Sequence, residues 1–351
     1  MEDNFWITDD EWLIFKPEFN EPLDNYCDVI NKYPKIIFSD YNNSEISIID
    51  KTENYNTEYI AHNRFNKNID LSNNINLTYL YLGYSFNFKL DLSNNINLKH
   101  LIFGYNFNQE IDLSKNINLE KLIFKKRYKQ NINLSNNINL EYLDLGEKFN
   151  NEINISNCIK LKKLIISNNY NYPIDLSNNI NLEYLDLGEK FNYKINISNC
   201  IKLQYLLLSE AYNEEIDLSK NINLIYLYFG FGFNKNQIIP YSVKTVELDN
   251  NNQYLIDNLH NNIEKLVLNY CSELNLDNLP NSIKQLVIYE YEDIILYDIS
   301  ELNNLPNSIE YLEFNNFTLK IKKIPKNLKT IKFPKNYKYI DDFKDYEVIT
   351  Y

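Results

Sequence analysis

The chain is poor in the residue types on which most catalytic motifs depend. Its 351 residues include 6 glycines, 3 histidines and 4 cysteines. Phosphate-binding loops need closely spaced glycines, and the sequence has no P-loop, no Gly-x-Gly-x-x-Gly and no Gly-x-Ser-x-Gly segment. His62, His100 and His260 lie too far apart in the chain to form a motif with metal-ligand spacing. The sequence therefore predicts a protein that is not an enzyme and holds no cofactor or metal.

Long apolar runs are missing as well. No stretch approaches the roughly 18 to 20 consecutive apolar residues that cross a bilayer, and no basic segment followed by an apolar one opens the chain. Cys158 and Cys200 occupy equivalent repeat positions about 10 Å apart, beyond disulfide reach. We expect buried thiols in a reducing compartment, no membrane insertion and a cytoplasmic location, which is the host cytoplasm if the protein is viral.

A surplus of basic residues is also absent. The formal net charge is -13 at pH 7, so no nucleic-acid partner is predicted. The charge is uneven, because residues 1–60 hold 14 acidic and 4 basic residues, whereas residues 320–338 hold 8 lysines and no acid. One alternative function is therefore a structural component that associates with itself head to tail through oppositely charged ends.

A unit of 21 residues, first complete at residues 69–89, repeats without insertion through about half of the chain. So short and regular a period predicts one elongated solenoid in which each coil contacts only its neighbours. The first position of the unit, Ile69, returns seven times, as Leu90, Ile111, Ile132, Ile153, Ile174, Ile195 and Ile216.

Equivalent positions of the eight coils form columns, each named by its residue in the first coil. The Ile75 and Leu77 columns are invariant and apolar, so we expect both to point inward. The Phe86 column holds only Phe or Tyr and predicts an aromatic spine. The Asn73 and Asn76 columns accept Lys, which predicts that they face water.

Three further columns predict how the turns are built. The Asn74 column holds Asn six times and Cys twice, which predicts a buried ladder of side chains that donate to turn carbonyls. The Ser72 column is always Ser, as expected for a hydroxyl that bonds its own turn. Five glycines follow the Leu-x-x-Leu-x-Leu segment, where a positive φ or a crowded backbone is expected: Gly83, Gly104, Gly146, Gly188 and Gly230.

These motifs resemble those of a known repeat family. The segment Cys158-Ile-Lys-Leu161-Lys-Lys-Leu164-Ile-Ile166 resembles leucine-rich repeats, and Phe86-Asn-Phe-Lys-Leu90 is similar to the FNIP repeat. From residue 238 onward Leu-Pro-Asn-Ser-Ile segments strengthen the likeness, as at 279–283 and 305–309. Similar asparagine-rich proteins occur in large DNA viruses of amoebae and in social amoebae. The resemblance implies a right-handed solenoid of about 14 coils with a parallel concave β-sheet, short strands or irregular turns on the convex side, and few helices.

The chain divides by pattern into four parts. Residues 1–46 read as an N-terminal cap, 47–237 as the regular coils, 238–340 as FNIP-like coils of the same solenoid, and 341–351 as an acidic tail. Irregular coils are expected to begin near Tyr33, with Tyr59 and Phe65 aligned to Leu80 and Phe86.

Two short helices are predicted in the cap. Residues 8–11 have capping-box spacing before the apolar run 12–15, and residues 23–30 carry apolar side chains at helical spacing. A second alternative function reads this segment as a degenerate adaptor that recruits the chain to a ubiquitin ligase as its substrate-recognition subunit.

The concave sheet is the predicted functional surface. Residues that alternate with the buried leucines point outward and form two adjoining columns, headed by Tyr79 and Tyr81. Exposed aromatic rows rimmed by charge suit a protein partner of unknown identity. The alternative is that tyrosine suits strands and that an AT-rich genome supplies it cheaply. The predicted partner-binding residues are Tyr79, Tyr81, His100, Tyr142, Asp144, Tyr184, Asp186, Tyr205, Tyr226 and Tyr228.

Two charged features are predicted to be less specific. The Asp70 column stacks carboxylates or amides on the convex side and reads as a solvated surface. The basic cluster at residues 121–129 either docks an acidic partner or is a solvated face. We therefore expect a non-catalytic scaffold for protein–protein interaction that is a monomer or associates weakly with itself.

Overall fold

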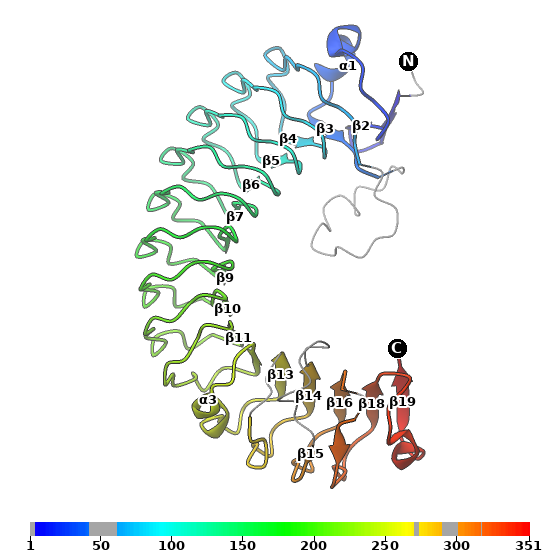
Figure 1. Cartoon of the computed structure of the whole chain (residues 1–351). Helices are drawn as coiled ribbons and strands as arrows, with labels where there is room; N and C mark the ends of the chain where they lie inside the picture. Colours follow the sequence, from blue (N-terminus) through cyan, green and yellow to red (C-terminus); the bar gives the residue numbers. More distant parts are fainter. Residues whose placement is uncertain (1–3, 42–61, 270–273, 290–300, 317) are drawn as a thin grey trace. The chain divides into compact units, whose positions relative to one another are not determined.

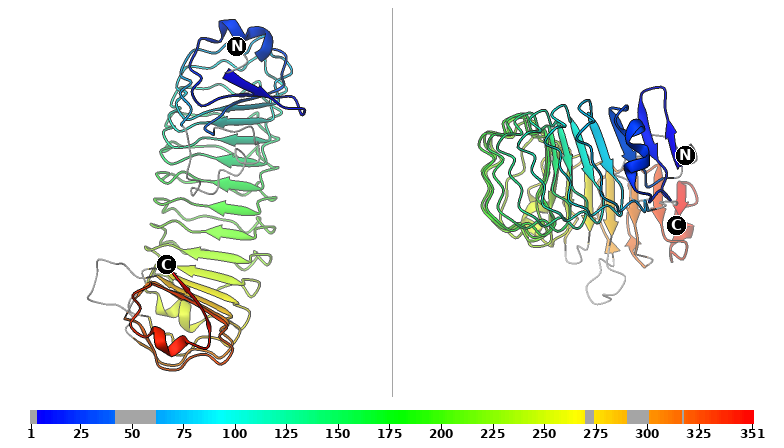
Figure 2. Two further views of the ribbon diagram at one scale, coloured as in Figure 1. Left: turned by 90° about the vertical axis from the view of Figure 1, so that its right-hand side faces the viewer. Right: turned by 90° about the horizontal axis from the view of Figure 1, so that it is seen from above.

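The computed structural model describes residues 4–41, 62–269, 274–289, 301–316 and 318–351. They form two compact units, residues 1–182 and 183–351. In each unit, parallel strands stack in chain order along the inner, concave side (Figures 1 and 2).

The first unit is a stack of short strands, each one coil further along the chain than the last. β1 pairs antiparallel with β2, and the later pairs among the described strands are parallel, for example Tyr79 opposite His100 and His100 opposite Lys121. The parallel pairing follows from the 21-residue period, which returns the chain to the same position once per coil. The strands are β1 (Phe5–Ile7), β2 (Trp12–Phe15), β3 (Lys35–Phe38), β4 (Tyr79–Leu82), β5 (His100–Phe103), β6 (Lys121–Ile123), β7 (Tyr142–Asp144) and β8 (Lys163–Ile165).

The second unit has the same construction, with main-sheet strands of three to five residues. Its main sheet is parallel throughout, and β15 (Glu301–Leu302) and β17 (Lys320–Ile321) form a separate pair. Residues 341–351, expected as a tail, contain η3 (Ile340–Phe343) in part and the last strand. The main strands are β9 (Tyr184–Asp186), β10 (Tyr205–Leu207), β11 (Tyr226–Phe229), β12 (Thr245–Leu248), β13 (Lys265–Asn269), β14 (Gln285–Tyr289), β16 (Tyr311–Phe314), β18 (Thr330–Phe333) and β19 (Glu347–Thr350).

Helices are few, which confirms the predicted fold class. In the described residues the α-helices are α1 (Cys27–Ile30) and α3 (Gln253–Asp257), with η2 (Leu23–Tyr26) leading into α1. The helical turns over residues 23–30 were predicted, and Leu23, Tyr26 and Ile30 are buried there.

The predicted helix over residues 12–15 is wrong, because this segment is strand β2. Its side chains Leu13, Ile14 and Phe15 are fully buried between β1 and β3. Glu11 adopts a positive φ of 64°, and the backbone N–H of Glu11 donates to the carbonyl of Thr8 in a tight turn. Sheet pairing of an apolar, aromatic run therefore overrides the local capping signal. Residues 4–41 consequently lack the first of the two helices predicted for the cap.

The predicted inward Leu77 column and the predicted aromatic spine are confirmed. The Leu77 and Leu80 columns are buried in every regular coil, and the aromatic spine runs through the first unit as stacked rings. Neighbouring centroids from Phe65 to Tyr170 lie 5.9 to 6.2 Å apart. Tyr59, predicted to align with Leu80, lies outside the described residues.

The prediction that the Ile75 column points inward is wrong. In the first unit these isoleucines are between 49% and 60% exposed. The backbone N–H of Leu77 donates to the carbonyl of Asn74 at 3.2 Å, so Ile75 is the second residue of a β-turn. The central side chains of such a turn point away from the turn's own hydrogen bond, here toward solvent. The exposed residues are Ile75, Ile96, Ile117, Ile138, Ile159 and Ile180.

The asparagine ladder is confirmed and explains how the turns are closed. Asn116 Nδ2 donates to the carbonyls of Leu92 and Asn95, in the coil before, at 3.0 and 2.9 Å. The Asn73 and Asn76 columns are exposed, as predicted, and form outer ladders, since Asn97 Nδ2 donates to the Ile75 carbonyl at 3.0 Å. The buried carbonyls of Leu92 and Asn95 already accept the backbone N–H groups of Asn95 and Leu98, so Asn116 gives each of them a second donor from the next coil.

Candidate functional site

The first outward column of the first unit packs on itself. Tyr79 contacts the ring of Trp12 at 4.7 Å and that of His100 at 5.5 Å between centroids. The ammonium groups of Lys121 and Lys163 lie 5.2 and 5.0 Å from the ring centre of Tyr142. These side chains contact one another across neighbouring strands, and Tyr79 is only 5% exposed.

The second outward column of this unit is buried at its first three positions, Tyr81, Ile102 and Ile123. Tyr81 packs in an apolar cluster with side chains from neighbouring strands, and its hydroxyl donates to the buried carboxylate of Asp40. Asp40 also accepts from the backbone N–H groups of Asn63 and Tyr84 at 2.8 and 2.9 Å. Burial raises the pKa of Asp40 despite these hydrogen bonds. The expected exposure is therefore wrong at Tyr79 and Tyr81, and Asp40 is a structural partner that the column pattern did not reveal.

Asp144 and Asp186 each bond the end of their own strand. Asp144 Oδ1 accepts from the N–H of Gly146 at 2.8 Å, and Asp186 Oδ1 accepts from that of Gly188 at 2.9 Å. Both glycines have a positive φ, near 70°, as predicted for the glycine column. The two carboxylates are half-buried, so a local structural role accounts for their geometry.

The second unit presents a tyrosine row. Tyr184, Tyr205 and Tyr226 stand in register on β9, β10 and β11, with neighbouring ring centroids 6.0 and 6.1 Å apart. Tyr205 is 39% exposed and the other two are half-buried. Here the predicted outward aromatic column does reach solvent.

Three carboxylates lie beside this row, those of Glu210, Glu247 and Asp249. Together with Tyr226 and Tyr228 we call them the acid–tyrosine cluster. The hydroxyl of Tyr226 donates to Glu247 at 2.5 Å, and that of Tyr228 lies within hydrogen-bond distance of both Glu210 and, at 2.8 Å, Asp249. Within the part of the chain that the structure describes, no Lys or Arg forms an ion pair with any of the three. Burial raises the pKa of Asp249, and the charges of Glu210 and Glu247 add to the effect.

A related carboxylate further along is neutralised. Glu313 accepts from the hydroxyls of Tyr289 and Tyr311 at 2.5 and 2.6 Å and forms an ion pair with Lys332 at 2.8 Å. Burial opposes ionisation of Glu313, but the bonds from Lys332 and the two tyrosines outweigh it and lower the pKa. The acid–tyrosine cluster differs because it has no such lysine.

Solved structures similar to this chain share its coil architecture. The functional domain of InlJ from Listeria monocytogenes, which includes a cysteine ladder, is 20% identical, with a TM-score of 0.56 over 76% of this chain and 60% of that chain. CroV588, a circular LRR protein, is 25% identical, with a TM-score of 0.59 over 95% and 55%. The internalin inlF from Listeria monocytogenes is 14% identical, with a TM-score of 0.52 over 81% and 83%. The fold is that of a leucine-rich-repeat solenoid.

Sequence comparison adds no family name. Neither a protein-family model nor a curated protein matches the chain. The chain spans 60% and 55% of the length of the first two structures. The likeness therefore establishes the repeat fold, and proteins of this fold serve as scaffolds with extended binding surfaces.

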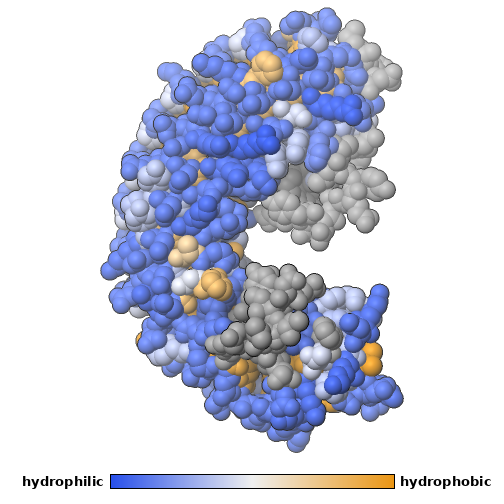
Figure 3. Space-filling view, viewed as in Figure 1, coloured by the Kyte–Doolittle hydropathy of each residue, from blue (hydrophilic) through white to orange (hydrophobic). Residues whose placement is uncertain are grey.

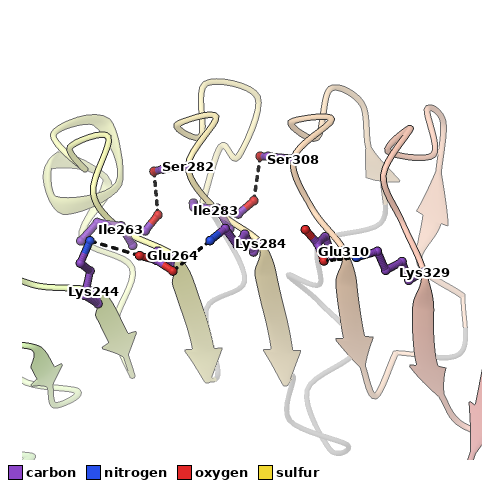
Figure 4. Close-up of polar contacts among 9 residues, drawn as sticks. All are labelled: Lys244, Ile263, Glu264, Ser282, Ile283, Lys284, Ser308, Glu310 and Lys329. Carbon is purple, nitrogen blue, oxygen red and sulfur yellow. Dashed lines mark hydrogen bonds and ion pairs between the residues drawn. The ribbon is translucent and has the colours of Figure 1, made fainter.

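Charged side chains that directly precede neighbouring strands form ion pairs with one another. Glu264 bridges Lys244 and Lys284 at 3.1 and 3.2 Å, and Glu310 meets Lys329 at 2.6 Å (Figure 4). The basic cluster of residues 121–129 is also engaged, since Lys126 pairs with Glu147 at 3.0 Å. Such exposed pairs contribute little stability. The face shown in Figure 3 is largely hydrophilic.

Possible metal ligands and cysteine thiols are the remaining reactive groups of the described residues, and Cys27 is a free, exposed thiol. No cluster of three or more His, Cys, Asp or Glu that could hold a metal occurs among them. Burial raises the pKa of the Cys158 and Cys200 thiols to about 11, so neither is a reactive thiolate at neutral pH. No helix among the described residues is long and apolar enough to span a membrane.

Proposed function

We propose that this chain is a non-catalytic leucine-rich-repeat scaffold that binds a protein partner through the concave face of its second unit. The observation that carries the proposal is the tyrosine row beside the acid–tyrosine cluster. Aromatic rings supply contact area at low cost in conformational entropy. Carboxylates without a cation favour a partner that brings one. The partner is therefore a protein with lysine or arginine side chains next to an apolar patch.

The surface is centred on fewer residues than the sequence pattern indicates. Tyr184, Tyr205, Tyr226 and Tyr228 carry the contact, and Asp186 borders it. In the first unit Tyr79 and Tyr81 are buried, whereas His100, Tyr142 and Asp144 are half-buried and remain candidate contacts on that unit's own sheet face.

Removal of the cluster's charge tests this function. We expect Glu247→Gln with Asp249→Asn to weaken capture of a partner from host-cell extract at least tenfold, because two carboxylates that would meet its cations are neutralised. The matched control is Glu264→Gln, which removes an exposed charge from a different column. Capture is measured by affinity purification with quantitative mass spectrometry at low and high salt. Equal capture by the cluster variant and the control would exclude the cluster.

The proposal includes a cytoplasmic location, FNIP-like character of the coils after residue 238 and a viral or amoebal origin, all of which rest on the sequence pattern.

The two alternative functions have less support. Lys322, Lys329 and Lys332 pair with Glu301, Glu310 and Glu313 inside the second unit, which partly neutralises the lysine-rich end. The adaptor alternative needs a helical N-terminal segment, and residues 12–15 are strand.

A further inference from the structure

The acid–tyrosine cluster is one continuous hydrogen-bond network. Asn269, the last residue of β13, joins two of its carboxylates, because Asn269 Nδ2 donates to Glu247 Oε1 and to Asp249 Oδ1, each at 2.8 Å. Tyr228 joins the third carboxylate to the network, since its hydroxyl lies within hydrogen-bond distance of Glu210 Oε1 and Asp249 Oδ2. Neighbouring carboxylates therefore share their donors.

The network has fewer donor hydrogens than hydrogen-bond contacts. Each of the six carboxylate oxygens in the cluster contacts one donor atom among the described residues. Those donors carry five hydrogens, namely one on the hydroxyl of Tyr226, one on that of Tyr228, two on the amide of Asn269 and one on the backbone nitrogen of Phe231. When all three carboxyl groups are ionised, one contact therefore lacks a hydrogen.

The missing hydrogen belongs to the contacts of Tyr228. Its single hydroxyl hydrogen can point to Glu210 or to Asp249, and the other contact would then bring two oxygens together with no hydrogen between them. A proton on Asp249 Oδ2 closes both contacts, because Asp249 then donates to the hydroxyl oxygen of Tyr228, which donates in turn to Glu210. Burial raises the pKa of Asp249 and also that of Tyr228, so the hydroxyl keeps its own hydrogen.

The charged groups around Asp249 favour this proton. Glu210 and Glu247 face Asp249, and their charges add to the effect of burial on its pKa. Lys265, on the neighbouring strand β13, stands opposite Thr245 in the other outward column and forms no ion pair with the cluster. The parts of the second unit that lie outside the described residues contain no lysine or arginine. The proton is therefore the only positive charge that the cluster's own surroundings supply.

The site around Glu313 shows what a cation does in a similar arrangement. Each contact there has its own hydrogen, from the hydroxyls of Tyr289 and Tyr311 and from the ammonium group of Lys332. Although burial opposes ionisation, Lys332 and the two hydroxyls lower the pKa of Glu313. A cation in contact thus keeps a half-buried carboxylate of this sheet ionised.

We propose that Asp249 holds a proton in the free chain and that a cationic side chain of the partner displaces it, which makes binding at the acid–tyrosine cluster pH-dependent. The displacement rests on the proposed function. The O–H bond of Asp249 breaks as the cation arrives, and its proton passes to water. Acid therefore competes with the partner, and a site that must lose one proton binds about tenfold more tightly one pH unit above the midpoint of Asp249 than one unit below it.

The proton is tested in the free chain, without a partner. The full chain, labelled with ¹³C at its aspartate carboxyl groups, is titrated by NMR, and the Asp249 signal is the one that Asp249→Asn removes. We expect a midpoint above that of a turn-capping aspartate such as Asp112. Glu210→Gln supplies the missing hydrogen from its amide and should lower the midpoint, whereas the control Glu264→Gln should leave it unchanged. A midpoint no higher than that of Asp112, or one that Glu210→Gln does not lower, would overturn the proposal.

The displacement is tested with an arginine peptide as the probe. Tetramethylrhodamine-labelled Gly-Leu-Arg-Leu-Gly-amide stays charged at its guanidinium across the titration, and fluorescence polarisation gives its affinity for the full chain one pH unit below and one above the measured midpoint. We expect about tenfold tighter binding above the midpoint, the same change in Glu264→Gln and no change with pH in Asp249→Asn. Equal affinity of the unaltered chain at the two pH values would overturn the displacement.

The two experiments separate this inference from the proposed function. Absence of peptide binding at both pH values would overturn the proposed function and the displacement with it, whereas the midpoint of Asp249 in the free chain decides the proton alone.

Discussion

Asparagine serves two different purposes in neighbouring positions of the same coil. The side chain of Asn116 is fully buried, and its amide nitrogen donates hydrogen bonds to two carbonyls of the previous coil. Two residues on, Asn118 makes a similar bond to the Ile96 carbonyl at an exposed edge. The two hydrogen bonds are chemically alike, so burial decides how much each contributes to the stability of the fold. Cysteine at 158 and 200 retains the small volume and a weak donor.

Replacement of these two asparagines separates burial from bonding. We expect Asn116→Leu to cost about 1 to 3 kcal/mol, because two buried carbonyls lose a side-chain donor and keep only the backbone N–H of their own turn. Asn118→Leu should cost less than about 0.5 kcal/mol, since water can replace the amide. Urea unfolding followed by circular dichroism measures both. A cost for Asn118→Leu equal to that for Asn116→Leu would refute the assignment of the ladder.

The convex aspartates are turn caps, which makes them sensitive to acid. The backbone N–H and then the hydroxyl of Ser114 lower the pKa of Asp112 below 3.8, and Ser219 does the same for Asp217. A folded-state pKa below the unfolded value contributes stability above about pH 4 that is lost as the pH falls through the folded pKa. Asn133 fills the same position and keeps the bond, with Ser135 N–H at 3.0 Å.

This comparison predicts the effect of a neutral cap. The variant Asp112→Asn with Asp217→Asn should show a smaller drop in melting temperature between pH 7 and pH 2.5 than the unaltered chain. Differential scanning fluorimetry at both pH values provides the measurement. An unchanged drop would mean that these carboxylates titrate with the same pKa in the folded and unfolded chain.

At the scale of the element, each strand is set by its alternating leucines and by the residue directly after them. The Leu-x-Leu segment predicted the strands because leucine at both inward positions fits one buried face. The glycine after the strand allows close contact with the previous coil. A Cβ added at Gly104 would lie 1.9 Å from the carbonyl oxygen of Gly83, which is shorter than any tolerated contact.

Gly104→Ala should therefore cost about 2 kcal/mol or more, because the backbone of one coil must move away from the next. Ser167 occupies the same column in another coil of the first unit, so Ser167→Ala is the matched control and should cost less than about 1 kcal/mol. Chemical denaturation of both variants decides the matter. A loss for Gly104→Ala no greater than for the control would show that the coils are not in close contact there.

Sequence periodicity predicted the leucine-rich-repeat fold, the aromatic spine and the buried asparagine ladder, because each column repeats one environment eight times. It misplaced the Ile75 column because an invariant apolar position can sit at the outward corner of a turn as well as in a core. The capping signal before Trp12 failed because β2 is paired on both sides. The capping pattern of residues 8–11 carries no information about the two strands, β1 and β3, with which β2 pairs.

At the scale of the whole molecule, the sequence could place the two outward columns but not their surroundings. Tyr81 is buried and bonded to Asp40, 41 residues earlier in the chain. Tyr228 meets Glu210 and Asp249, which stand in different coils and outside the two columns. The same column position is therefore a buried support in the first unit and part of an acidic, half-exposed surface in the second. The periodicity of the columns alone does not predict this difference between Tyr81 and Tyr228.

Equilibrium binding of the captured partner to two tyrosine variants tests the central claim most directly. Tyr184→Ala with Tyr205→Ala removes two of the three rings of the tyrosine row, whereas the control Tyr193→Ala removes a ring that is 38% exposed and lies next to Phe191, off the sheet. Isothermal titration calorimetry should show at least a tenfold loss of affinity for the double variant and less than a twofold change for the control. Equal affinity of the double variant and the unaltered chain would contradict binding through the concave face of the second unit.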